Sequence, residues 1–460
     1  MPTYPPLIPG QKFKAYGQEI TWTSSHYTPS QLRPLLFSSD EQADQCIARL
    51  ESLYPTSSPR DHLSLLLSHH SSDPILSQFW SELTTLPDWV SLPQLHRAQR
   101  VFYRYLAPNI TGLSFQSLLG GLASPSVSSV LSQTNGFSSN AARRRLLQTF
   151  QHLLDVTLSP EALRLPDGPG FLSAVRVRLL HASVRRRLLS KSSSSHEPIP
   201  INDLHSLATV LSYSISLTDL SLPRQGIFLS IQEREDWLSL WRYLAYLLGT
   251  THDCLSSIDK ARAMLESLVV SELNASDTSR RLAASMLASL ANKPPMFASE
   301  GFLKAQGRWL NGKELSGELG IVDRQRWTWG VYYDLLVAGQ CGIFIMGHML
   351  NKAMGMLGLG DWWDDLAVEG GRKVVRKRLG QMLEDTASIT GQGKGKGEYV
   401  VDWWSFKSQD DDSRGKGPRG GILSIEQKIL VMMIVMLGGI GWVGWIVFRA
   451  LVWAGESRWW

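Results

Sequence analysis

The segment 429–448 constrains this chain more than any other feature, because its twenty residues carry no charged side chain. A helix of this length spans roughly 30 Å, at about 1.5 Å per residue, which is the thickness of the hydrocarbon core of a bilayer. Lys428 and Arg449 bracket the segment, and Trp442 is a residue type that favours the membrane interface. We therefore predict a transmembrane helix at 429–448, followed by a short tail at 449–460.

The stretch before this apolar run has the composition of a linker. Between 390 and 421 the chain is rich in glycine and in charge, so it buries too little apolar surface to become ordered. We predict that 351–428 is an irregular linker. Lysine and arginine are more numerous before the apolar run than after it, which predicts that the large N-terminal part is cytosolic. A buried core helix is the alternative for the apolar run, and the linker beside it favours the membrane.

Composition describes a globular protein and excludes several functions. Hydrophobic residues make up 43% of the chain and charged residues 19%. The net charge of +5 is not accompanied by a nucleic-acid-binding motif, so we predict no nucleic-acid partner. Cys46, Cys254 and Cys341 are far apart and odd in number, which argues against a disulfide framework and against a cysteine-ligated cluster. The absence of an HExxH motif argues against a protein-built zinc site.

Apolar residues recur at helical spacing through most of the remaining chain, and no run of alternating strands occurs. The pattern predicts helices at 93–106, 141–156, 171–189, 203–217, 231–248, 258–273 and 276–290. Thr28 followed by Pro29 is typical of a helix N-terminus. We predict an all-α fold with a single large helical domain at 16–350, preceded by an N-terminal extension at 1–15.

The segment 335–350 is also apolar, but it carries Gln340 and His348 and has only sixteen residues. Such a segment is short for a membrane span. We predict a helix that is buried in the body or lies in the membrane interface.

His181 has the most unusual surroundings of the eleven histidines. It lies within a predicted helix, with Arg178 one turn before it and Arg185 one turn after it. The same helix carries an apolar stripe of Val177, Leu180, Val184 and Leu188. A neutral imidazole that faces an apolar cavity can bind iron, and a nearby arginine can pair with a haem propionate. Without further information, this pattern more often belongs to a hydrogen-bonded core histidine. We take His205, on the next predicted helix, as the control histidine that is not expected to bind iron.

The run 173–187 resembles the central motif of the family that joins the latex-clearing rubber oxygenases with the ER-bound oxygenase of fungal mycophenolic acid biosynthesis. Other pieces match that family in the same order along the chain. They are Trp22-Thr with Thr28-Pro-Ser-Gln-Leu-Arg-Pro-Leu, Asp88-Trp-Val, Arg97-Ala-Gln-Arg-Val-Phe-Tyr-Arg-Tyr105, Leu118-Leu-Gly-Gly121, Thr134-Asn-Gly-Phe137, Arg144-Arg-Leu-Leu-Gln-Thr149, Asp236-Trp-Leu-Ser-Leu-Trp-Arg-Tyr243 and Leu248-Gly-Thr250. Each piece is modest, but their shared order over about 20–250 is specific.

The resemblance implies a helical fold that holds a b-type haem, with His181 as the proximal ligand of the iron. Arg178 matches the family's arginine one turn before that histidine. On the distal side the rubber-cleaving members carry an Arg-x-x-Lys-Thr pattern, which Arg145 and Thr149 match. Gln148 stands where the family has lysine. An amide is a much poorer iron ligand than an amine, so the resemblance implies a distal side that differs in detail.

The resemblance also implies a function. It points to a membrane-anchored, haem b-dependent oxygenase that uses dioxygen to cleave a carbon–carbon double bond of a hydrophobic, isoprenoid or prenylated substrate. The candidate catalytic residues are Arg145, Gln148, Thr149 and Arg178; Thr209 is the candidate for a cofactor-side threonine on the next helix. The endoplasmic reticulum is the expected membrane, with the catalytic domain in the cytosol.

Two other functions remain open at this point. One is a non-catalytic, membrane-anchored protein that binds haem or lipid on the same scaffold, which the replacement of lysine by Gln148 favours. The other is a tail-anchored structural adaptor, which requires His181 to be an ordinary core histidine.

Overall fold

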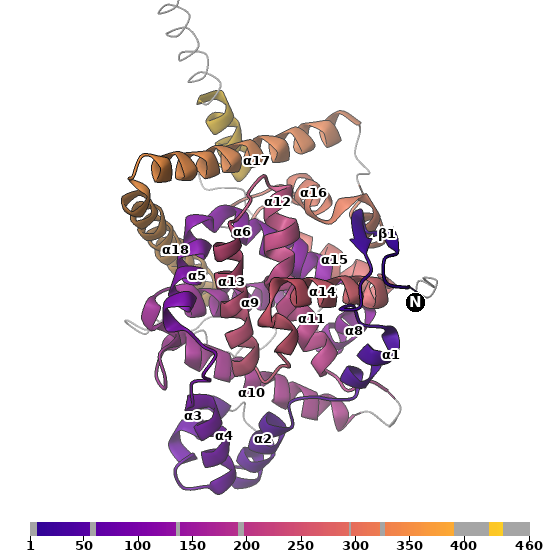
Figure 1. Cartoon of the computed structure of the whole chain (residues 1–460), viewed down its shortest axis with the longest axis vertical. Helices are drawn as coiled ribbons and strands as arrows, with labels where there is room; N and C mark the ends of the chain where they lie inside the picture. The colour runs from indigo at the N-terminus through magenta and orange to yellow at the C-terminus, as the bar shows by residue number, and fades with distance from the viewer. Residues whose placement is uncertain are drawn as a thin grey trace, which may run out of the picture.

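The computed structural model describes residues 7–55, 61–134, 139–191, 197–293, 296–322, 327–390 and 423–435, without the side chains of 139–141, 327–329 and 378–390. In these ranges the regular structure is helical apart from one two-stranded hairpin (Figure 1). The predicted all-α fold is confirmed.

The elements follow one another in chain order. They are β1 (Lys12–Ala15), β2 (Gln18–Thr21), α1 (Pro29–Leu32), η1 (Arg33–Leu36), α2 (Glu41–Leu53), α3 (His62–His69), α4 (Pro74–Thr84), α5 (Leu92–Arg104), α6 (Leu106–Gly112), η2 (Leu113–Leu118), α7 (Leu119–Gly121), α8 (Pro125–Gln133), α9 (Ser139–Thr157), η3 (Pro160–Leu163), α10 (Pro169–Leu189), α11 (Asp203–Tyr213), η4 (Leu217–Ser221), α12 (Leu222–Arg224), α13 (Ile231–Leu247), η5 (Asp253–Ser256), α14 (Ile258–Glu272), α15 (Asp277–Leu290), α16 (Glu300–Glu318), α17 (Trp327–Met356) and α18 (Gly360–Thr390).

The predicted helices of the body correspond to α5, α9, α10, α11, α13, α14 and α15, with small differences at their ends. The largest difference is in α11, which ends at Tyr213. Ser214 has φ −96° and ψ −92°, so the backbone leaves the helix there. The predicted N-terminus at Thr28 is confirmed, since Thr28 and Gln31 form a capping box at the start of α1.

The N-terminal hairpin corrects the predicted domain boundary. Tyr16 and Gly17 both have positive φ, as a two-residue hairpin turn requires. β1 and β2 therefore pair directly, and Ala15 is buried against the body. Residues 12–15 belong to the folded domain rather than to an extension, because the turn brings them onto β2.

The predicted irregular linker at 351–428 is wrong in its first half. Residues 360–390 form α18, which packs on α5 (Figure 1). Asp364 near the start of α18 pairs with Arg100 and Arg104 of α5, and Val368 is buried. Sequence composition alone did not reveal this helix, because its ion pairs and its buried Val368 and Val375 involve segments that are distant in the sequence. Residues 391–422 and 436–460, including most of the predicted transmembrane helix, lie outside the described residues.

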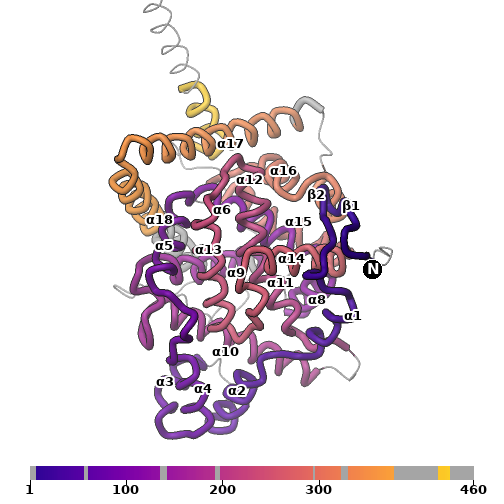
Figure 2. Tube along the Cα trace, in the orientation of Figure 1, coloured from indigo at the N-terminus to yellow at the C-terminus, as the bar shows by residue number. Residues whose placement is uncertain are grey.

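The body extends from α2, α3 and α4 at one end to α17 at the other (Figure 2). α10 runs through it and packs against α2 and α3 on one side and α9 on another. Next to it, α5 and α13 pair closely around the stacked rings of Phe102 and Trp237. A second core beside the hairpin joins α15, α16 and α17.

Two ion pairs hold α10 on α2. Arg178 donates through Nε and Nη2 to both carboxylate oxygens of Asp40, at 2.6 and 2.8 Å. One helical repeat further on, Arg185 donates to Asp44 at 2.7 to 3.0 Å. Both guanidinium groups are buried. Such bidentate, charge-assisted pairs are directional, so they also set the rotation of α10 about its own axis.

Gly249 lies directly against the first of these pairs. Its φ is +67°, and a Cβ atom there would be 2.2 Å from Asp40 Oδ2 and 2.6 Å from Arg178 Nε. We expect Gly249→Ala to lower the free energy of unfolding by about 3 kcal/mol, from the left-handed backbone and the disturbed buried pair. Thermal unfolding of the detergent-solubilised chain measures the change. Gly317→Ala in α16, with no atom within 4 Å of the added Cβ, is the control and should not destabilise. An equal effect of both substitutions would contradict the prediction.

Candidate functional site

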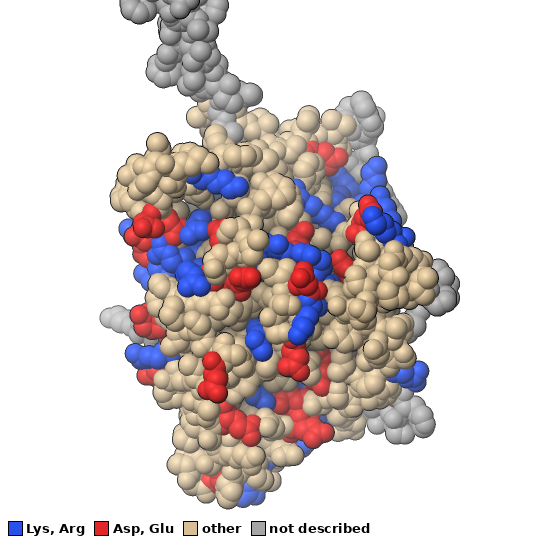
Figure 3. Space-filling view, in the orientation of Figure 1, with Lys and Arg blue, Asp and Glu red and all other residues tan. Residues whose placement is uncertain are grey.

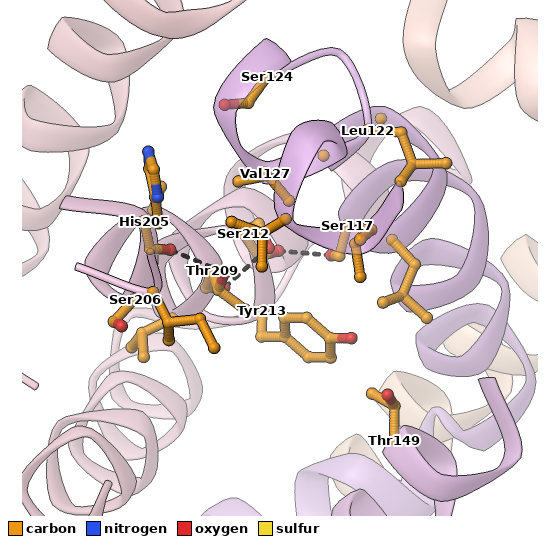
Figure 4. A pocket seen from close by; sticks show the side chains of 18 of the residues that line it. Ser117, Leu122, Ser124, Val127, Thr149, His205, Ser206, Thr209, Ser212 and Tyr213 are labelled. Atoms are coloured by element: carbon orange, nitrogen blue, oxygen red, sulfur yellow. Dashed lines mark hydrogen bonds between the residues drawn. The ribbon is translucent and has the colours of Figure 1, made fainter. Parts of the chain in front are cut away.

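A partly open cavity of about 1000 Å³ lies between α9, α10, α11 and α14 and the segment around α7. Its walls are largely apolar, with residues such as Leu153, Val177, Leu188 and Trp241. Figure 4 shows Thr209 and Tyr213 of α11 on one side of this space and Thr149 of α9 on another. A space of this size and lining suits a large apolar ligand with a few polar contacts.

His181 lines this cavity from α10, together with the apolar stripe predicted beside it. Among the described residues, the His181 ring has no hydrogen-bond partner. Burial, helped by the nearby Arg185 charge, lowers the pKa of His181 to about 4. The imidazole is therefore neutral at physiological pH. The ring lines the cavity without a hydrogen-bond partner, so an ordinary hydrogen-bonded core histidine is a poor description of this residue.

Arg178 does not line the cavity, contrary to its predicted place beside the cofactor. Its guanidinium is held by Asp40 and lies over the ring of Phe79. The physical reason is helix geometry: Arg178 and Arg185 lie about 20° apart around the helix, while His181 lies about 60° from Arg178. The two arginines face α2, and the histidine faces the cavity.

The predicted distal residues come together on α9. Arg145, Gln148 and Thr149 all line the cavity, on the helix that packs against α10. Arg145 donates to the backbone oxygen of Leu131 at 3.2 Å and to Thr134 Oγ1 at 2.6 Å, at the end of α8. Burial and the neighbouring arginines lower the pKa of Arg145. Its guanidinium is thus committed to α8, while Gln148 and Thr149 present shorter polar groups to the same space.

Thr209 also lines the cavity, and its hydroxyl donates to the backbone oxygen of His205 at 2.8 Å (Figure 4). A hydroxyl that is bonded to its own helix is less available to a ligand than a free one. Tyr213, one turn further along α11, has a buried hydroxyl without a partner. Burial raises the pKa of Tyr213.

Sequence reasoning missed two further histidines of this cavity. His152 of α9 contacts Ser173 Oγ through Nδ1 at 3.1 Å, but its Nε2 is buried without a partner. Burial, with a smaller effect of the neighbouring His181, lowers the pKa of His152 to about 4. In His205 both ring nitrogens are buried without a partner. The sequence signal for His152 was its spacing, because it follows Arg145 by seven residues, about two helical turns, and so lies on the same side of α9. His205 therefore cannot serve as the control histidine, because its unpartnered ring lines the same cavity.

An all-helical body around an apolar, histidine-lined cavity is the kind of arrangement that suits a large apolar ligand. The comparisons with known proteins narrow this description. The model of the family described as "ER-bound oxygenase mpaB/B'/Rubber oxygenase, catalytic domain" matches residues 103–338, which is just over half of the chain and includes α9, α10 and α11. The chain therefore belongs to this family, and by that membership it is an oxidoreductase of the oxygenase type.

A solved structure supports the fold assignment. The structure of latex clearing protein LCP in the closed state matches with a TM-score of 0.53 and 19% sequence identity, over 67% of this chain and 85% of that chain. At this identity the match shows a shared fold. No curated protein matches the sequence.

Burial lowers the pKa of His205 to about 4, which predicts a pH-dependent stability. The unfolded chain binds a proton at this histidine below about pH 6.5, whereas the folded chain excludes it until about pH 4. The contribution is complete above pH 6.5 and is lost as the pH falls. Between pH 7 and 5 we expect His205→Phe to lose less unfolding free energy than the wild type, by on the order of 2 kcal/mol.

Denaturant unfolding followed by circular dichroism at the two pH values measures this difference. Ser206→Ala, at a neighbouring residue of the cavity lining, is the matched control and should keep the wild-type pH dependence. Identical pH dependence of His205→Phe and the wild type would refute a buried neutral His205.

Proposed function

We propose that this protein is a membrane-anchored haem b oxygenase that cleaves a carbon–carbon double bond of a hydrophobic, isoprenoid or prenylated substrate with dioxygen. The observation that carries the proposal is the neutral, unpartnered imidazole of His181 on the wall of a large apolar cavity. The α10 helix that carries it lies within the matched oxygenase domain.

The residues of the cavity fit a haem group. His181 would hold the haem iron, since its ring offers a nitrogen without a competing hydrogen bond. Arg144 and Arg187 line the same cavity, and guanidinium groups suit the carboxylates of haem propionates. Among the described residues, no cluster of three or more histidine, cysteine or acidic side chains is placed to hold a bare metal ion. A single histidine would hold iron only as part of a porphyrin.

When bound, haem supplies the oxygen chemistry that the protein side chains lack. The apolar walls exclude water and hold an alkene substrate. Thr149 has a hydroxyl and Gln148 an amide on the α9 side of the cavity, and both can donate a hydrogen bond to an oxygen atom of the reactants. Arg145, with its bonds to Leu131 and Thr134, fixes this part of α9 against α8 and is a positioning residue.

Arg178 has a related role in this proposal. With its side chain paired to Asp40, it positions α10 and thereby His181, and it touches neither cofactor nor substrate. Thr209 lies on the cavity wall and contributes to the shape of the cofactor pocket more than to hydrogen bonding, since its hydroxyl is committed to the α11 backbone.

A non-catalytic haem or lipid-binding protein on the same scaffold is the second candidate. The observation that favours it is Gln148, which lines the cavity where rubber-cleaving relatives carry lysine. A structural adaptor is disfavoured, since it leaves the unpartnered His181 unexplained.

The proposed membrane topology follows from the charge distribution. The apolar run at 429–448 with its excess of preceding basic residues supports a single C-terminal span with a cytosolic body. The family description names an ER-bound oxygenase, which supports the endoplasmic reticulum as the membrane of this chain.

Haem absorption tests the assignment of the ligand. We expect the purified chain to show a Soret band that His181→Ala abolishes, because His181 is the proposed ligand of the iron. His69→Ala is the control and should keep the band, since His69 lies on α3 and bonds to Tyr54.

We expect Thr149→Val to keep the band but to slow oxygen uptake with a prenylated alkene roughly tenfold, the equivalent of about 1.4 kcal/mol for one lost hydrogen bond.

Three outcomes would change the proposal. A colourless wild-type protein would rule out both haem functions. A Soret band without oxygen uptake or aldehyde formation across isoprenoid alkenes would favour the non-catalytic binder. A band that persists in His181→Ala would move the ligand to His152 or His205.

Glycosylation tests the topology. The chain has sequons at Asn109 and Asn274, but Asn109 is buried and its amide donates to the Phe102 backbone oxygen. Asn274 is exposed and is therefore the informative site. With a cytosolic body, we expect Asn274 to stay unmodified in microsomes and the body to be digested by added protease. A glycosylated Asn274 in a protease-protected body would reverse the orientation.

A further inference from the structure

The outer face of α17 is an uninterrupted apolar stripe. Its residues follow one another at three- and four-residue spacing, so they share one side of the helix. They are Leu335, Ala338, Gly342, Ile345, Met346, Met349, Ala353 and Met356. Leu335 is 61% exposed, Met349 58% and Met356 85%. Soluble proteins rarely leave such a continuous apolar surface uncovered, so this face indicates a partner.

The inner face of α17 is bonded to the body along its length. Gln340 is buried and pairs with Gln306 of α16. Two turns later, His348 is buried and contacts the hydroxyl of Tyr105 at 3.1 Å. By length and composition alone, Gly330–Met356 could cross a membrane. A helix that crosses a bilayer here would have to break these contacts and expose their polar groups to lipid, which is strongly unfavourable because lipid offers them no hydrogen-bond partner.

The first turns of the predicted membrane anchor pack on this same helix. Residues 425–435 are helical, and Gly339 of α17 lies against Met433, where an added Cβ would be 2.2 Å from the sulfur atom. Ile425 N donates to the Met296 backbone oxygen at 2.9 Å, and Ser299 N donates to Glu426 at 2.6 Å. The apolar run at 429–448 therefore starts on the body beside α17 and not at the end of a free tether.

The outward surfaces of α17 and of the anchor segment 429–435 are both apolar. Met432, Ile434 and Val435 of the anchor segment are at least half exposed. Just after α17, Leu357 and Trp362 are also exposed. Figure 3 shows mostly uncharged surface over α17 and charged side chains below it. The apolar surface is thus continuous with the segment predicted to enter the membrane.

We propose that α17 lies flat in the membrane interface, with the stripe from Leu335 to Met356 in contact with lipid. We identify the bilayer as the partner that covers this face, because the anchor segment leaves the body directly beside α17. The membrane surface must therefore lie at the height of α17. Amphipathic helices bind in this way by burying their apolar face at the headgroup–acyl boundary. The inference rests on the proposed anchor. Contact of α17 with lipid would hold the body against the membrane in one defined orientation.

Depth measurements on the full-length chain test this inference. An environment-sensitive dye is attached to single cysteines introduced by Leu335→Cys, Met346→Cys, Met349→Cys and Met356→Cys. The native cysteines are buried, and the unsubstituted chain reports any labelling of them. Each variant is reconstituted in phosphatidylcholine vesicles with a minor fraction of phosphatidylserine. Nitroxide-labelled lipids then report the depth of the dye, and aqueous iodide reports its exposure to water.

Ser68→Cys is the matched control, since Ser68 is an exposed residue of α3, and α3 lies at the end of the body opposite α17 (Figure 1). We expect the α17 positions to be quenched best by shallow nitroxides, at one common depth along the helix. We also expect iodide to quench them several-fold less than Ser68→Cys. Val435→Cys on the anchor should be quenched by deeper nitroxides.

The alternatives give different results. If iodide reaches the α17 positions as freely as Ser68→Cys while Val435→Cys is in lipid, the anchor stands and the α17 inference is wrong. If Val435→Cys is also exposed, the proposed anchor itself fails. A depth that is greatest at Met346 and shallow at both ends would show a membrane span. Shielding that persists in detergent and depends on protein concentration would show a second copy of the chain on this face.

Discussion

The paired arginines of α10 are the constraint on which the rest of the site depends. A buried guanidinium without a counter-ion is costly, so Arg178 and Arg185 must face Asp40 and Asp44. This requirement sets the rotation of α10 and directs His181 toward the cavity. Gly249 belongs to the same arrangement, because any side chain there would enter the space of the Arg178–Asp40 pair.

The cavity gathers polar atoms that the fold leaves without partners. The ring nitrogens of His205, one nitrogen of His152 and the Tyr213 hydroxyl are all buried and unbonded, and the His181 ring is unpartnered. Folded proteins satisfy most such groups, and departures concentrate at functional sites. Several of these groups therefore line the cavity of a domain that belongs to an oxygenase family.

Part of the architecture could be predicted from sequence because it depends on local rules. The helices α5, α9, α10, α13, α14 and α15 follow from apolar periodicity, and the start of α1 follows from the Thr28 and Pro29 signal. Collinear motifs identified the family, which the family model confirms. By contrast, α18 was missed: its place on the body depends on the ion pairs of Asp364 with α5 and on the burial of Val368 and Val375, and these are contacts with segments distant in sequence.

The candidate site also has features that the sequence determines and features that only the tertiary structure decides. Sequence alone determined that His181 lies in an apolar helical stripe. It also determined that 429–448 has the length and composition of a membrane span. Tertiary structure decided which way each side chain points. A one-dimensional spacing places Arg178 and His181 on neighbouring parts of one helix, but only the position of Asp40 on α2 decides which of them faces the cavity.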